Sequence, residues 1–249
     1  MVDASAAAPL GRADVVDRNG VLLATNLPTA SLYAEPRRIL DAAETALALV
    51  ALLPALDVAE LEEDLASDRG FIWVKRNLTP NQQAEIHALG LPGLEFLREE
   101  RRVYPQGQLT SHVVGFTDID RIGLAGAEMA LEDELQSRAA EGGEPLALSL
   151  DVRVQQVVRE ELAATIETFS ALGGTGIVLD VHTGEVMAMV SLPDFDPNHP
   201  TAASALSRFN RATKGVYELG SVFKVLTVAM ALDSGATKGT ALHFRHVAL

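Results

Sequence analysis

The chain has 249 residues, a formal net charge of -14 and no cysteine. Its length allows one large domain or two small ones with a sizeable core. The acidic balance argues against nucleic acid as a partner, because a duplex binder needs a basic face, and the lack of cysteine excludes disulfides, thiolate metal sites and a cysteine nucleophile.

The sequence contains neither a membrane span nor a signal peptide. The best apolar stretch, residues 45–59, contains Pro54 and is shorter than the ~20 residues a spanning helix needs. Residues 1–10 lack a basic n-region and an apolar h-region. If the protein works outside the cytoplasm, we expect its targeting segment to have been removed.

The first half alternates short strands and helices. Asn19-Gly20 is a strong hairpin signal, and Thr79-Pro80 is typical of a helix start. In chain order we predict a hairpin over 13–26, a helix over 36–53 between Pro36 and Pro54, an acidic helix over 57–68, a strand over 70–78, a helix over 79–91, an extended segment over 93–105 and a helix over 123–140.

A glycine-rich linker at residues 141–145 predicts a boundary between a domain over 1–140 and a second over 146–249. After it we expect a helix over 152–169 capped by Asp151, a hairpin over 173–193 and an apolar helix starting near Ser221. The fold class is therefore α+β. A sheet normally has about five or six strands, so the two strands of the second half look like the opening of a larger domain.

Ser221 and Lys224 lie three residues apart at the front of the apolar helix, which places them on one face. A helix that is apolar all round is expected to be buried all round, and a desolvated lysine loses its proton more readily. Lys224 could then act as general base for a Ser221 nucleophile. Gly220 and the Ser221 backbone N–H, at the helix N-terminus, could hold an oxyanion.

This spacing alone is weak, since it occurs by chance in roughly one chain of this length in four or five. The structural alternative is that Ser221 is a helix N-cap and that Lys224 extends to the surface. The apolar surroundings favour chemistry without deciding the matter. The six histidines are scattered through the chain, and we expect no metal site.

Several ordered motifs resemble the class B penicillin-binding proteins, in particular the division-type peptidoglycan transpeptidases. The resemblance covers most of the chain and is far more specific than any one motif. It is carried by "VVDRNGVLLA" (15–24), "RRVYP" (101–105), "GLAGAE" (123–128), "LALSLDVRVQ" (146–155), "GIVLDVHTGEVMAMVSLPDFDPN" (176–198) and "FNRATKGVYELGSVFK" (209–224).

The resemblance implies an elongated N-terminal pedestal of the dimerisation type, followed by the opening part of a transpeptidase domain of the serine β-lactamase-like fold. The implied pedestal residues have structural roles, and we expect Arg102 to pair with Glu128. They are Asp17, Arg18, Gly20, Arg102, Gly123, Gly126 and Glu128.

The implied chemistry is acyl transfer. Ser221 would attack the D-Ala-D-Ala carbonyl of a peptidoglycan stem peptide with Lys224 as base, and β-lactam antibiotics would acylate the same serine. No cofactor is implied. The parent protein is expected at the periplasmic face of the bacterial inner membrane, with glycan-polymerising and other division membrane proteins as partners.

The sequence departs from the family pattern in two ways. Leu219 stands where the family usually has proline, and the S-x-N and K-T-G motifs are absent, since Lys238-Gly239-Thr240 has the letters in another order. We therefore expect this chain by itself to turn over poorly or not at all, with residues 1–140 as its ordered unit. The alternative function is a non-catalytic interaction module that docks cell-wall and division partners.

Overall fold

The computed structural model describes residues 11–236. The predictions for residues 1–10 and for Lys238-Gly239-Thr240 lie outside this range. The chain forms two compact units, of which unit 1 ends at Ala212 and unit 2 begins at Thr213. Unit 1 therefore extends well past residue 140, the predicted end of the ordered part.

One long strand, β2 (Leu22–Ala34), organises the first sheet of unit 1. It pairs antiparallel with β1 (Val15–Val16), β3 (Ile72–Leu78) and β4 (Leu94–Val103). A short strand, β5 (Leu146–Ala147), adds to β1 in parallel. Because β5 follows the 141–145 linker, its pairing with β1 ties the chain beyond the linker back to the first residues of the unit.

The predicted hairpin at Asn19-Gly20 is confirmed, with Gly20 at φ 82° in the turn between β1 and β2. The first half of β2 buries Leu23 in one core, and the second half buries Leu32 in another. The sheet thus joins two separately packed regions through a single strand.

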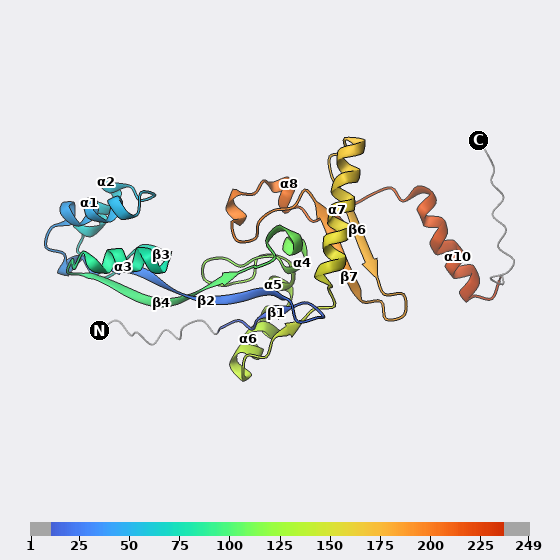
Figure 1. Ribbon diagram of the computed structural model, residues 1–249, viewed down its shortest axis with the longest axis horizontal. Coiled ribbons are helices and arrows are strands. Elements are labelled where there is room, and N and C mark those ends of the chain that lie inside the picture. The colour runs from blue at the N-terminus through green and yellow to red at the C-terminus, as the bar shows by residue number, and fades with distance from the viewer. Residues whose placement is uncertain (1–10, 237–249) are drawn as a thin grey trace. The chain divides into compact units, whose positions relative to one another are not determined.

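Three helices pack on the second half of the sheet (Figure 1): α1 (Ala42–Leu52), α2 (Val58–Leu65) and α3 (Pro80–Ala88). The predicted Thr79 N-cap is confirmed as part of a capping box. The predicted helix over 36–53 is wrong at its start, because the Asp41 side chain caps α1 and Pro36 opens only a separate 3-10 turn.

The first core is covered by α4 (Ser111–Val114), α5 (Gly126–Ala130) and α6 (Glu132–Glu141). The predicted helix over 123–140 is in fact two helices that meet at Leu131, where the backbone leaves helical geometry. Glu128 of α5 and Glu132, the first residue of α6, both belong to the polar network described below.

The last part of unit 1 is α7 (Val152–Phe169), capped by Asp151 as predicted, beside the predicted hairpin of β6 (Gly174–Leu179) and β7 (Val186–Leu192) (Figure 1). The apolar side chains of α7 are only partly buried, since Val157 is 58% and Phe169 77% exposed. The buried residue of the helix is Gln155.

Short segments follow, ending in the helix that carries the candidate nucleophile. They are α8 (Ala205–Arg208), α9 (Arg211–Lys214), a 3-10 turn (Gly220–Phe223) and α10 (Lys224–Asp233). The expectation that this helix is buried all round is wrong for the described chain, because Val225 is 69% and Met230 65% exposed. Within unit 2, no described element covers its apolar faces.

The predicted α+β class is confirmed, with helices and both sheets distributed along the whole described chain. Among the helices of residues 11–236, none has the length and apolar character needed to cross a bilayer.

Candidate functional site

The candidate nucleophile lies in the 3-10 turn that leads into α10. Gly220 has φ 49°, a left-handed conformation that glycine adopts without strain, and nothing lies within 4 Å of the position a Cβ would occupy. The backbone N–H of Lys224 donates to the carbonyl oxygen of Ser221. Both side chains are exposed. Ser221 thus lies in the 3-10 turn and Lys224 is the first residue of α10, both within unit 2.

The seven predicted pedestal residues all lie in unit 1, where they form two separate polar centres. Arg102, Gly123, Gly126 and Glu128 gather at the meeting point of β4, α5 and the 117–123 loop, whereas Asp17, Arg18 and Gly20 lie at the β1–β2 turn. Neither centre includes Ser221 or Lys224.

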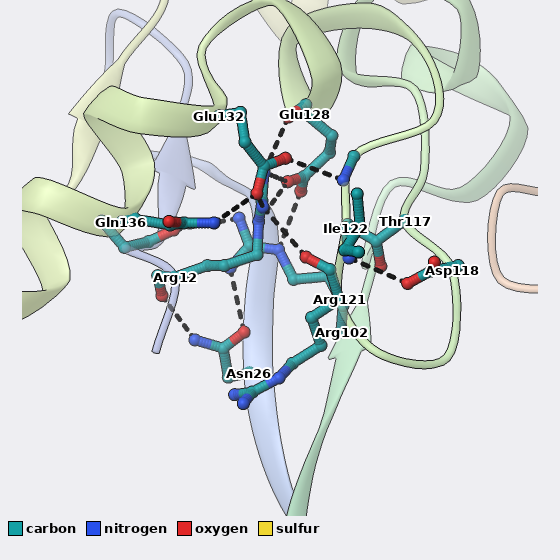
Figure 2. A network of polar contacts seen from close by, with 12 residues as sticks. Arg12, Asn26, Arg102, Thr117, Asp118, Arg121, Ile122, Glu128, Glu132 and Gln136 are labelled. Atoms are coloured by element: carbon teal, nitrogen blue, oxygen red, sulfur yellow. Dashed lines mark hydrogen bonds and ion pairs between the residues drawn. The ribbon is translucent and has the colours of Figure 1, made fainter. Parts of the chain in front are cut away.

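Glu128 is the centre of the first of these groups, shown in Figure 2. Its side chain is fully buried, and the predicted pair is present, with Arg102 Nε 2.8 Å from Glu128 Oε1. Arg12 approaches the other oxygen, at 2.7 Å from Nη2 to Oε2. Arg102 also donates to the carbonyl oxygen of Ala13 at 2.9 Å. One carboxylate thus joins the start of the chain, β4 and α5.

A second carboxylate, Glu132, extends the network (Figure 2). Its Oε2 accepts the Gly123 N–H at 2.7 Å, and its Oε1 lies 2.5 Å from Arg12 Nη1. Burial raises the pKa of Glu132, but the Gly123 N–H and the Arg12 guanidinium lower it by more, so the pKa lies below its ordinary value. The Glu132 side chain is therefore a charged carboxylate, and in that form it binds the 117–123 loop through the Gly123 N–H.

Glycines let backbone segments meet at this centre. A Cβ on Gly123 would lie 2.1 Å from the carbonyl oxygen of Glu128, and one on Gly126 would lie 2.6 Å from the backbone nitrogen of Gly115. Real Cβ atoms do not approach backbone so closely. Both positions of the "GLAGAE" motif are thus explained by close packing of α5 against its neighbours.

The second polar centre joins β1 to α7. Asp17 is 1% exposed, and its Oδ1 accepts the N–H groups of Asn19 at 2.7 Å and Val21 at 2.9 Å. Its Oδ2 accepts the N–H of Val152, the first residue of α7, at 3.1 Å. Burial raises the pKa of Asp17, but the hydrogen bonds from Val21, Val152 and Asn19 together bring it below its ordinary value.

Arg18 contributes a weaker contact beside Asp17, at 3.3 Å from Nη2 to Glu185 Oε2 with both side chains partly exposed. The backbone N–H of Arg18 donates to the carbonyl oxygen of Leu150 at 2.9 Å. The "DRNG" motif therefore forms a turn that also bonds to the start of α7, the first helix after the linker.

Sequence reasoning missed the residues whose partners are distant in the chain. Arg12 lies 116 positions from Glu128, and no local pattern marks it. Gln155 donates from Nε2 to the carbonyl oxygens of Leu109 and Met189, each at 2.9 Å, and accepts the Met189 N–H at 2.8 Å. A glutamine interrupting the apolar side of α7 was the available signal. Within residues 11–236, no group of three His, Asp or Glu side chains could hold a metal ion.

Two family descriptions match the chain in succession. The penicillin-binding protein dimerisation domain matches residues 7–159, and the penicillin-binding protein transpeptidase domain matches residues 174–246. The first covers the described part of unit 1 from residue 11 into α7. The second begins at β6 and includes Ser221 and Lys224.

Named relatives agree with this assignment. The chain is 46% identical over 224 residues to the probable peptidoglycan D,D-transpeptidase FtsI of Caulobacter vibrioides, covering 90% of the chain and 38% of that protein. It is 38% identical to the probable peptidoglycan D,D-transpeptidase PenA of Neisseria gonorrhoeae, covering 93% and 44%. The chain thus spans about two-fifths of the length of these relatives.

A solved structure agrees at the level of fold. A peptidoglycan synthetase from Bifidobacterium adolescentis superposes with a TM-score of 0.61 at 22% identity, covering 92% of this chain and 51% of that one. With the two domain matches and the named relatives, these findings show that the chain belongs to the penicillin-binding protein family, with a dimerisation domain followed by the start of a transpeptidase domain.

Proposed function

We propose that the full-length protein containing this chain is a peptidoglycan D,D-transpeptidase of cell division, with Ser221 as nucleophile. The observation that carries the proposal is the position of the Ser221–Lys224 pair within the segment that matches the transpeptidase domain. The printed names of the relatives support the reaction class. By the same likeness, the protein acts at the periplasmic face of the inner membrane.

In the proposed reaction, Ser221 Oγ attacks the carbonyl carbon of the penultimate D-Ala while Lys224 Nζ accepts the hydroxyl proton. The Ser221 N–H stabilises the oxyanion, and the positive end of α10 adds to the field. The peptide bond then breaks, and the terminal D-Ala leaves with the proton. The amino group of a neighbouring stem peptide attacks the acyl-serine, which forms the cross-link and frees Ser221.

We further propose that the 249-residue chain alone is nearly inactive. The sequence has no S-x-N or K-T-G motif, and in this family the K-T-G strand supplies an oxyanion donor. Loss of one such donor costs roughly 3–4 kcal/mol in the barrier. The helix α10 is also exposed, whereas acyl transfer needs a site that excludes water.

Fluorescent penicillin tests both statements. The full-length protein is expected to label strongly and its Ser221→Ala variant not at all, whereas the chain alone is expected to label weakly or not at all. Strong labelling of the chain would contradict the proposed inactivity. Undiminished labelling of the full-length Ser221→Ala variant would contradict the proposed nucleophile.

A second proposed role is docking of membrane proteins of cell-wall synthesis and division by unit 1. It is favoured by an exposed aromatic cluster in which Phe71 stacks on Tyr33 at 4.9 Å and meets Trp73 edge-on at 5.0 Å. Phe71 and Trp73 are each 42% exposed, and aromatic side chains are enriched at protein interfaces. A photo-crosslinker replacing Trp73 in the full-length protein should capture a membrane protein in cells, and the absence of any adduct would count against docking at this surface.

A further inference from the structure

Unit 1 contains a groove that neither the transpeptidase reaction nor the aromatic cluster uses. It has a volume of about 510 Å³ and lies between the end of β4, the loop at 116–124 and the segment at 197–208. The first two walls precede the 141–145 linker and the third follows it, with Tyr104 and Asn198 94 positions apart.

The groove is held open by hydrogen bonds centred on Tyr104, which is 3% exposed. The Tyr104 N–H donates to Asn198 Oδ1 at 3.0 Å, and Asn198 Nδ2 donates back to the Tyr104 carbonyl oxygen at 3.0 Å. On the opposite wall, the Thr117 N–H donates to the Tyr104 hydroxyl at 2.9 Å. Since Tyr104 bonds to both walls, the groove is preorganised. A ligand would therefore not lose binding free energy in ordering the groove.

Two features of the groove remain unexplained by the fold. First, apolar side chains stand exposed on its loop wall, where Ile119 is 52% and Leu124 50% exposed. Ile122 of the same loop is 55% exposed beside them. Apolar side chains gathered at the rim of a preformed hollow are typical of a site that another molecule covers.

Second, the groove carries cations without partners. Arg101 and Arg208 are exposed, and neither forms an ion pair within residues 11–236. The other arginines of the lining are engaged, Arg102 by Glu128 and Arg121 by Glu100 at 2.6 Å. The carboxylate of Asp118 accepts the N–H groups of its own turn. On a chain of net charge -14, two such guanidinium groups in one groove favour an anionic ligand.

We propose that this groove binds a linear segment of a partner protein in which carboxylates are flanked by apolar side chains. The inference rests on the docking role proposed above and names a site for it distinct from the Trp73 cluster. Arg101 and Arg208 would each bind a carboxylate, for which the planar guanidinium is well suited. Ile119 and Leu124 would cover the flanking apolar side chains. A saccharide would leave these aliphatic groups poorly matched, so a peptide fits better.

Selection from a phage-displayed library of random peptides against the full 249-residue chain tests the proposal. The selected peptides are expected to combine Glu or Asp with Leu, Ile or Phe. Synthetic copies, measured by fluorescence anisotropy, should bind the Arg101→Glu and Arg208→Glu variants at least about tenfold more weakly. Lysine in place of the acidic residue of the peptide should restore binding to these variants.

Arg98→Glu is the matched control. Arg98 lies on the same strand, is exposed and lines a different depression, so this variant should change binding by less than about twofold. The proposal is overturned if the selected peptides lack acidic residues, if both groove variants bind like the unchanged chain, or if a soluble disaccharide-peptide fragment of peptidoglycan displaces the peptide. Capture of a partner through Trp73 together with a failed groove test would leave docking intact and remove only this site.

Discussion

At the scale of residues, Glu128 has the greatest structural consequence. Its carboxylate is fully buried between two guanidinium groups, so its charge is compensated only while Arg12 and Arg102 stay in place. A buried ion pair contributes little net stability compared with apolar packing, but removing one partner is costly because the others keep their charge. This asymmetry makes the network a sensitive probe of the fold.

We therefore expect Glu128→Gln to lower the free energy of unfolding by about 3 kcal/mol, since glutamine keeps the shape but leaves the buried Arg102 without a carboxylate and Arg12 with Glu132 alone. Urea unfolding of the full chain measures it. The control is Glu134→Gln, which removes an exposed pair with Arg138 and should cost less than about 0.5 kcal/mol. Equal losses of unfolding free energy in the two variants would show that the buried pairs of Glu128 matter no more to stability than the exposed pair of Glu134.

Asp17 gives a prediction about pH. Its folded pKa lies below the unfolded value of about 3.9, so its contribution to stability is complete above that value and is lost as the pH falls through the folded pKa. Asp17→Asn should therefore lower the free energy of unfolding most near neutral pH. Below about pH 4, the difference in the free energy of unfolding between the variant and the unchanged chain should become smaller. Unfolding curves collected across this pH range provide the measurement. A difference in the free energy of unfolding that grew on acidification would refute a lowered pKa for Asp17.

At the scale of elements, the close approach of backbone at Gly123 is decisive for the placement of α5. Gly123→Ala would put a methyl group 2.1 Å from the Glu128 carbonyl oxygen, so α5 must shift and the Gly123–Glu132 hydrogen bond must lengthen. We expect a loss of about 2 kcal/mol or more in the free energy of unfolding. Gly70→Ala, where nothing lies within 4 Å, is the control and should change stability by less than about 0.5 kcal/mol.

The sequence predicts best those elements whose ends are fixed by local turn or capping residues. The Asn19-Gly20 turn, the Thr79 cap and the Asp151 cap each depend on residues a few positions apart. The sequence misplaces the start of α1 because Pro36 and Asp41 are both plausible starts, and the structure uses Asp41.

The network at Glu128 was predicted only in part, for a related reason. Arg102 and Glu128 could be paired in advance, whereas Arg12 has no local feature that distinguishes it from an exposed arginine. Its role depends on β1 being brought beside α5 and α6, which is a property of the assembled unit. The same holds for Gln155, whose partners lie on separate elements.

At the scale of the whole molecule, unit 1 extends through the predicted domain boundary. The β1–β5 pairing, the Asp17–Val152 hydrogen bond and the contacts of Gln155 all join residues before the 141–145 linker to residues after it. By contrast, the apolar side chains of α10 in unit 2 are exposed. The division into domains over 1–140 and 146–249 therefore remains a prediction. It differs from the division into compact units, which falls after Ala212.

Limited proteolysis distinguishes the two divisions. We expect the first cuts to fall beyond Ala212, leaving a fragment that retains both β1 and α7, because the contacts across the linker protect it. Mass spectrometry of the early fragments provides the measurement. Release of a separate piece starting near residue 146, before any cut beyond Ala212, would show that the contacts across the linker are weak.

Ser221, in the 3-10 turn that leads into α10, is the proposed nucleophile of a transpeptidase. The most direct test is to treat the full-length protein with a β-lactam, digest it and locate the adduct by mass spectrometry. If Ser221 is the nucleophile, one adduct forms, on the peptide that contains Ser221, and none forms in the Ser221→Ala variant. An adduct on any other residue, or one that persists in that variant, would contradict it.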